Sequence, residues 1–115
     1  MKNRILIVVD DLSDAEMISK LLKAKFEISL LTNPSKFLNI VSQVKPNLII
    51  LDSLFNSQDL CNMLFKENTY SDIPVIILSS LPALSFDEIL YPDRVIIIDF
   101  FDINLVRDKI LEITN

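Results

Sequence analysis

Two residue types are missing from this sequence altogether. Its 115 residues include no glycine and no histidine, although average usage would give about eight glycines. Without glycine the chain lacks the Walker A loop, the dinucleotide-binding fingerprint, the glycine-framed nucleophile elbow and the EF-hand loop. Without histidine it lacks Ser-His-Asp and Cys-His catalysis, the usual zinc sites and a phosphohistidine. Any chemistry must therefore rest on carboxylates, hydroxyls and lysines.

Cysteine and long apolar runs are scarce as well. The one cysteine, Cys61, has no partner for an internal disulfide, so we expect a protein of the reducing cytoplasm. The longest apolar run, residues 5–9, is far too short to span a bilayer. A net charge of −5 argues against binding of nucleic acid or an anionic membrane by this domain, because both favour Lys/Arg patches. The length predicts one domain over residues 1–115.

The apolar residues that are present form five short runs rich in isoleucine and valine. The runs are continuous rather than alternating, which is typical of strands buried on both faces of a parallel sheet. They cover residues 5–9, 28–31, 48–51, 75–78 and 95–98.

Between and after these runs, four stretches carry apolar residues at helical spacing. Asn33 and Pro34 supply a cap and a first-turn proline for the second stretch. The connection over residues 80–94 is weaker, because it holds two prolines and only a short helical segment at roughly 86–91. The four stripes are Met17, Ile18, Leu21 and Leu22; Phe37, Leu38, Val41 and Val44; Leu60, Cys61, Leu64 and Phe65; and Ile103, Val106, Ile110 and Ile113.

This alternation of strands and helices predicts a doubly wound α/β domain with three layers and right-handed crossovers. Five strands in 115 residues fit a flavodoxin-like (βα)5 arrangement with strand order 2-1-3-4-5 better than a Rossmann arrangement.

Polar residues follow all five runs, and the carboxyl ends of parallel strands meet at one edge of a sheet. The second run, followed by Thr32 and Asn33, lies away from the point where the strand order reverses, which leaves the residues after the other four. Carboxylates gathered there repel one another unless a cation neutralises them. An oxygen-only set selects a hard ion, with Mg²⁺ as the first expectation and Ca²⁺ or Mn²⁺ as the next. The alternative for any single aspartate is a helix cap or a turn. The residues are Asp10 and Asp11, Asp52, Ser79 and Ser80, and Asp99.

These segments resemble the receiver domain of bacterial two-component response regulators, the CheY-like domain, over essentially the whole chain. The matching pieces are ILIVVDD at residues 5–11, LIILD at 48–52 and IPVIILSS at 73–80. The resemblance implies a phosphoprotein of a phosphorelay, which takes a phosphoryl group from a sensor histidine kinase or a phosphotransfer protein. It also implies an output domain or another protein partner.

The resemblance further implies a role for each matching site residue. Asp52 is then the phosphoacceptor. Asp11 and Asp52 bind Mg²⁺ directly, Asp10 binds it through water, and the backbone carbonyl of Leu54 completes the protein ligands. Ser79 matches the hydroxyl residue that contacts the phosphoryl group.

Two positions depart from the family pattern on this same edge. Asp99 stands where the family has a lysine that pairs with the phosphoryl group, which reverses the charge beside the site. Ile96 stands where the family has an aromatic residue that switches between buried and exposed rotamers. The loop after Asp52 also lacks the family's Met-Pro-Gly stretch.

These features leave two functions open. The first is a diverged receiver domain that is phosphorylated on Asp52. The second is a pseudo-receiver, a module for protein interaction or dimerisation that does not depend on phosphorylation; the resemblance would place a homodimer on its fourth- and fifth-helix face. We do not expect an enzyme, because aspartate-nucleophile phosphatases need a second aspartate two residues after the nucleophile, and after Asp10 that position is Leu12.

Overall fold

The computed structural model describes residues 3–9, 12–52, 57–67, 70, 72–79, 95–99 and 103–114. Within them, strands and helices alternate along the chain, with one 3₁₀ turn before the second helix. The elements are β1 (Asn3–Val8), α1 (Leu12–Leu22), β2 (Phe26–Leu31), η1 (Pro34–Lys36), α2 (Phe37–Val44), β3 (Leu48–Asp52), α3 (Ser57–Lys66), β4 (Val75–Ser79), β5 (Val95–Asp99) and α4 (Ile103–Thr114).

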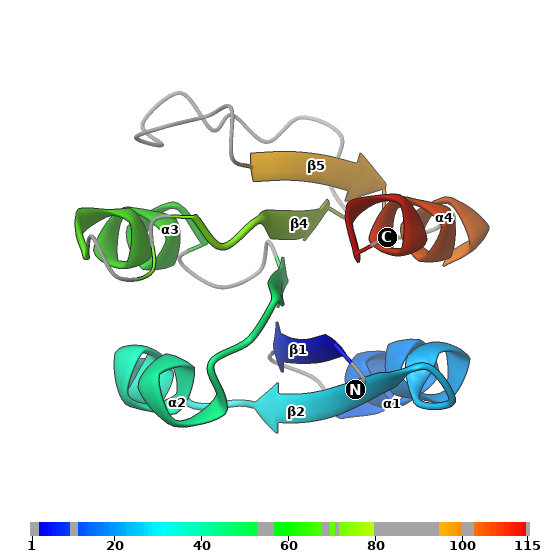
Figure 1. Ribbon diagram of the computed structural model, residues 1–115, viewed down its shortest axis with the longest axis horizontal. Helices are drawn as coiled ribbons and strands as arrows, with labels where there is room; N and C mark the ends of the chain where they lie inside the picture. Colours follow the sequence, from blue (N-terminus) through cyan, green and yellow to red (C-terminus); the bar gives the residue numbers. More distant parts are fainter. Residues whose placement is uncertain are drawn as a thin grey trace.

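All neighbouring strands pair in parallel, in the order β2-β1-β3-β4-β5. Helices α1 and α4 cover one face of this sheet, and α2 and α3 cover the other (Figure 1). The predicted doubly wound, three-layer fold and its strand order are therefore confirmed. The short helix predicted at 86–91 lies outside the described residues.

The continuous apolar runs are explained by the two faces of the sheet. Along β1, Ile5 and Ile7 belong to the core beneath α1 and α4, whereas Leu6 and Val8 belong to the core beneath α2 and α3. All four side chains are fully buried. Since successive side chains of a strand point to opposite faces, a strand covered on both sides needs an apolar residue at every position.

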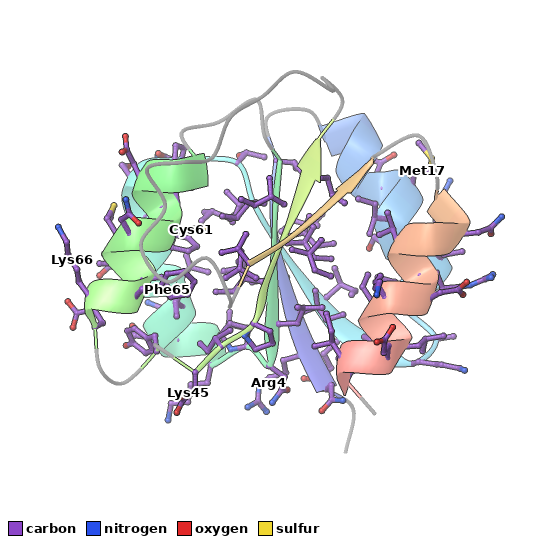
Figure 2. All side chains as sticks on the ribbon, turned by 90° about the horizontal axis from the view of Figure 1, so that it is seen from above. Arg4, Met17, Lys45, Cys61, Phe65 and Lys66 are labelled. Atoms are coloured by element: carbon purple, nitrogen blue, oxygen red, sulfur yellow. The ribbon has the colours of Figure 1, made fainter. Side chains whose placement is uncertain are left out.

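The predicted inner stripe is confirmed in full in α3 and in part in the other helices; in α4, Val106 and Ile110 are buried, and Ile113 is partly buried. In α3, all four stripe residues are buried, with Cys61 and Phe65 on the side facing the sheet (Figure 2). In α1 the prediction is half wrong: Ile18 and Leu22 are buried, but Met17 is 50% exposed and Leu21 36%. The apolar residues of α1 thus form a wider stripe than the part of the helix that faces the core.

The start of the second helical stretch follows the predicted cap. The side-chain oxygen of Asn33 accepts hydrogen bonds from the backbone N–H of Ser35 at 3.1 Å and from its hydroxyl at 2.7 Å. Pro34 occupies the first helical position, as predicted. The first turn is a 3₁₀ turn rather than an α-helical one, and α2 itself begins at Phe37.

A compact set of hydrogen bonds closes the end of the sheet where the strands begin. The backbone N–H of Arg4 donates to the side-chain oxygen of Asn47 at 2.8 Å, and the N–H of Asn47 donates to the carbonyl of Arg4 at 2.7 Å. The guanidinium Nε of Arg4 donates to the carbonyl of Lys45 at 3.0 Å. Lys45 is left-handed, with φ of 52° and ψ of 60°, and among the described residues it is the one with positive φ. Arg4 and Lys45 lie together at this end in Figure 2.

Among the described residues, no helix is long and apolar enough to cross a membrane.

Candidate functional site

The candidate site lies where the strands end, opposite the Arg4–Asn47 hydrogen bonds. Strand β3 ends at Asp52, β4 at Ser79 and β5 at Asp99. Because these strands are parallel neighbours in the sheet, their last residues share one edge. The structure thus brings together three of the positions that the sequence singled out, and at these positions it describes the backbone.

The strand register orders these three residues further. Asp52 is the partner of Leu78, and the next residue of β4, Ser79, is the partner of Asp99. Ser79 therefore lies directly beside Asp99, whereas Asp52 lies one strand away in the other direction and one residue earlier along the strands. Neighbouring strands lie about 4.8 Å apart, so the backbones of Asp52 and Asp99 are separated by about 10 Å.

Strand β1 brings the chain to the same edge. Val8 is the partner of Leu51 in β3, so Val9 reaches the level of Asp52. The N–H of Val9 still donates to the carbonyl of Leu31 at 3.1 Å, and its side chain is 1% exposed. Asp10 and Asp11 follow Val9 in the sequence.

Three of the predicted metal ligands, Asp10, Asp11 and Leu54, lie outside the described residues. Among the residues that are described, no group of three or more His, Cys, Asp or Glu side chains could hold a metal ion. The magnesium site and the individual ligand roles therefore stay predictions. Ile96 is placed in β5 as the partner of Ile76 in β4.

Cys61 is the one thiol in the chain, and it lies away from this edge, in the core beneath α2 and α3. Burial raises the pKa of its thiol to about 12. A thiol with such a pKa stays protonated at neutral pH and is a poor nucleophile or metal ligand. Cys61 is therefore a core residue.

Known proteins resemble this chain in both sequence and structure. No family model matches it. The DNA-binding response regulator MtrA of Mycolicibacterium smegmatis is 32% identical to it over 84 residues, which is 70% of this chain and 36% of MtrA. The chain thus spans little more than a third of that relative.

Solved structures share the fold over the full length. The response regulator receiver domain from Bermanella marisrubri superposes with a TM-score of 0.83 at 20% identity, with 100% of both chains covered. The N-terminal domain of the nisin resistance regulator NsrR superposes with a TM-score of 0.80, also at 20% identity and with 100% of both chains covered. The chain belongs to the receiver domain family of response regulators.

The resemblance predicted from three sequence segments is confirmed by this membership. In this receiver domain, Ser79 has Asp99 as its direct partner, and Asp52 lies on the other neighbouring strand, opposite Leu78. The departure of Asp99 from the lysine of the family stays a prediction. The strand register places Asp99 directly beside Ser79 and about two strand spacings from Asp52.

Proposed function

We propose that this receiver domain works in a bacterial phosphorelay, with Asp52 as the phosphoacceptor. The main support is the place of Asp52 at the end of β3, level with Val9 and one strand from Ser79. Doubly wound sheets bind their ligands beyond the carboxyl ends of the strands. The proposal gives the domain no enzymatic turnover. It places the domain in the cytoplasm, where its phosphodonor would be found.

The proposed reaction is an in-line phosphoryl transfer. A carboxylate oxygen of Asp52 attacks the phosphorus of a phosphohistidine on a kinase or phosphotransfer protein. A new P–O bond forms, the P–N bond breaks, and the electron pair leaves with the imidazole nitrogen, which takes up a proton. The hydroxyl of Ser79 would donate a hydrogen bond to a phosphoryl oxygen.

The donor chemistry of this edge fits a magnesium ion. In the proposal, Asp11 and Asp52 bind it directly, Asp10 through water, and Leu54 through its carbonyl. Such an all-oxygen set suits Mg²⁺, which when bound neutralises charge on the transferred phosphoryl group. Two solved structures of this fold support this view: response regulator Rcp1 has an Mn²⁺-bound form, and the cyanobacterial phytochrome response regulator RcpA is known in a phosphorylated form.

The test is incubation with Mg²⁺ and acetyl phosphate, read by intact mass. We expect the wild type to gain the mass of one phosphoryl group and Asp52→Asn to gain none. Asp108→Asn is the matched control, since Asp108 lies on the exposed side of α4, 3.4 Å from Arg107. Labelling that persists in Asp52→Asn would contradict the assignment of Asp52.

The position of Asp99 favours a second function, that of a pseudo-receiver. A carboxylate beside Ser79 opposes the build-up of negative charge on Asp52. In that case the domain binds another protein or an output domain whether or not Asp52 is phosphorylated. Unlabelled wild type, together with Asp52→Asn that retains its biological output, would favour this second function over the first.

A further inference from the structure

Strand β2 forms one outer edge of the sheet, and the direction of its free backbone groups can be worked out. It pairs with β1 alone among the described strands, and Figure 1 shows it as the outermost strand between α1 and α2. The N–H of Val9 in the residue after β1 donates to the carbonyl of Leu31. The backbone groups of Leu31 therefore point toward β1. Because this direction alternates along a strand, the N–H and carbonyl groups of Phe26, Ile28 and Leu30 point to the free edge.

The same three residues also place their side chains on one face. Phe26 is buried in the core beneath α1 and α4, and Ile28 packs against that core. Leu30 is the next residue on this face, and its side chain is 42% exposed. The free edge thus combines outward-facing hydrogen-bonding groups with an apolar row that the sheet of a single copy covers only in part.

We propose that β2 pairs antiparallel with β2 of a second copy of this chain, across a two-fold axis, so that two sheets become one of ten strands. The pairing places Ile28 opposite Ile28 of the second copy. Phe26 then lies opposite Leu30 of the second copy, and Leu30 opposite Phe26. All three pairs are of the hydrogen-bonded kind, since in each of them both residues point their backbone groups outward.

The side chains suit a second copy in this register. On the α1 face, the pairs Phe26–Leu30 and Ile28–Ile28 make a continuous apolar row of cross-strand contacts. On the other face, Glu27 lies opposite Ser29 of the second copy, so the two glutamates do not face each other. A shift of the register by two residues toward the amino end would bring Glu27 opposite Glu27, which is unfavourable. The sequence of β2 is therefore self-complementary in one register.

Helix α2 leaves room for this arrangement. Helix α2 packs against both β1 and β2, so it lies over the outer strand pair rather than beyond the edge. Strands are spaced about 4.8 Å apart, so the two copies of such a helix would lie about 10 Å apart across the axis. Packed helices lie about 8–10 Å apart, so the α2 helices of the two copies would lie at an ordinary packing distance.

The edge lacks most of the devices that prevent such pairing. Natural edge strands are protected by prolines, inward-facing charges or bulges. Within β2 there is no proline, and Glu27 is its one charged residue. This surface is distinct from the fourth- and fifth-helix face that the family resemblance favours for a homodimer, and the pairing does not involve Asp52.

Sedimentation equilibrium over a wide range of protein concentration tests the proposal. We expect a reversible dimer in the wild type and at least about a tenfold rise in its dissociation constant in Leu30→Lys, because an apolar contact is lost once per copy. Leu21→Lys is the matched control: it places the same charge on a leucine of α1 that is 36% exposed, and dimerisation should not change. A chain that stays monomeric throughout, or two variants with equal effects, would overturn the proposal.

Amide hydrogen exchange identifies the surface independently. At low concentration, the amides of Phe26, Ile28 and Leu30 should exchange faster than those of Glu27 and Ser29, which face β1. At high concentration, exchange at the first three should slow down. If the slowing fell on residues 95–114 instead, the dimer would use the face of β5 and α4. If it fell on β2 only after addition of another protein, the edge would serve a foreign strand. Either result would overturn the proposal.

Discussion

At the amino ends of the strands, the chain is tied together by hydrogen bonds between Arg4, Lys45 and Asn47. At the carboxyl ends, by contrast, β3, β4 and β5 finish in Asp52, Ser79 and Asp99, so that acidic positions lie on the strands either side of β4. The first end satisfies its polar groups within the fold. The second brings two acidic positions to one edge of the sheet.

This difference indicates that the amino end of the sheet contributes mainly to stability and the carboxyl end mainly to function. Hydrogen bonds made within the chain stabilise the native state directly, so substitutions at the amino end should change the free energy of unfolding. Gathered carboxylates repel one another, which favours binding of a cation. Substitutions at the carboxyl end should therefore act mainly on ligand binding and phosphorylation.

The largest effect is expected from Asp99→Lys, measured as the rate of phosphoryl labelling. Asp52 and Asp99 are two strand spacings apart, about 10 Å, where two unit charges interact by about 2 kcal/mol at an effective dielectric constant near 20. Phosphorylation adds roughly one negative charge, and the substitution changes the charge at position 99 by two units. After allowance for screening by salt, we expect labelling to become at least tenfold faster.

The control variant for this prediction is Asp99→Asn, which removes the negative charge without adding a positive one. Its gain should be smaller than that of the lysine variant. A rate that Asp99→Lys leaves unchanged would show that the charge at the end of β5 does not limit phosphorylation. Repulsion between carboxylates would then not explain how the carboxyl end of the sheet behaves.

Much of the fold could be predicted because burial on both faces leaves a strong pattern. Strands β1 and β3 are apolar at successive positions, and the sequence alone marks both as central strands. The outer strand β2 was harder to delimit. It begins at Phe26, two residues before the predicted run, because Glu27 interrupts the apolar pattern on the half-covered strand.

Two local features could not be predicted for physical reasons. A left-handed residue is usually recognised by its glycine, and this chain has none, so nothing in the sequence marked Lys45. The exposure of Met17 and Leu21 depends on how α1 is rotated about its axis against the sheet, which helical periodicity alone does not specify.

The sequence predicts which residues of the candidate site lie at the ends of strands, but not which of them are cross-strand neighbours. Asp52 and Ser79 were placed on one edge because both directly follow buried strands. That Ser79 lies beside Asp99 required the register of β4 and β5, because a slip of one residue would change every cross-strand neighbour. The metal ligand roles of Asp10, Asp11 and Leu54 stay predictions.

A smaller effect is expected at the amino end from Asn47→Ala. The substitution removes the acceptor for the backbone N–H of Arg4, a bond of 2.8 Å, and leaves the N–H of residue 47 bonded to Arg4 as before. We expect a loss of about 1 kcal/mol in the free energy of unfolding, measured by urea denaturation. Phosphoryl labelling should keep the wild-type rate. Slower labelling would mean that the two ends of the sheet are coupled.

The smallest effect is expected from Lys45→Gly, and it should stabilise the protein. Lys45 has φ of 52° and ψ of 60° at the end of α2, a conformation that costs a residue with a Cβ atom about 1–2 kcal/mol. Glycine avoids this cost but loses more chain entropy on folding, about 0.5–1 kcal/mol. The net gain should be about 0.5–1 kcal/mol, with the carbonyl at position 45 still accepting from Arg4. Lys25→Gly is the control, since Lys25 lacks a positive φ and its replacement should destabilise. If Lys45→Gly destabilised to the same extent, the hydrogen bonds around Arg4, rather than the local backbone preference, would be what determines the conformation of this turn.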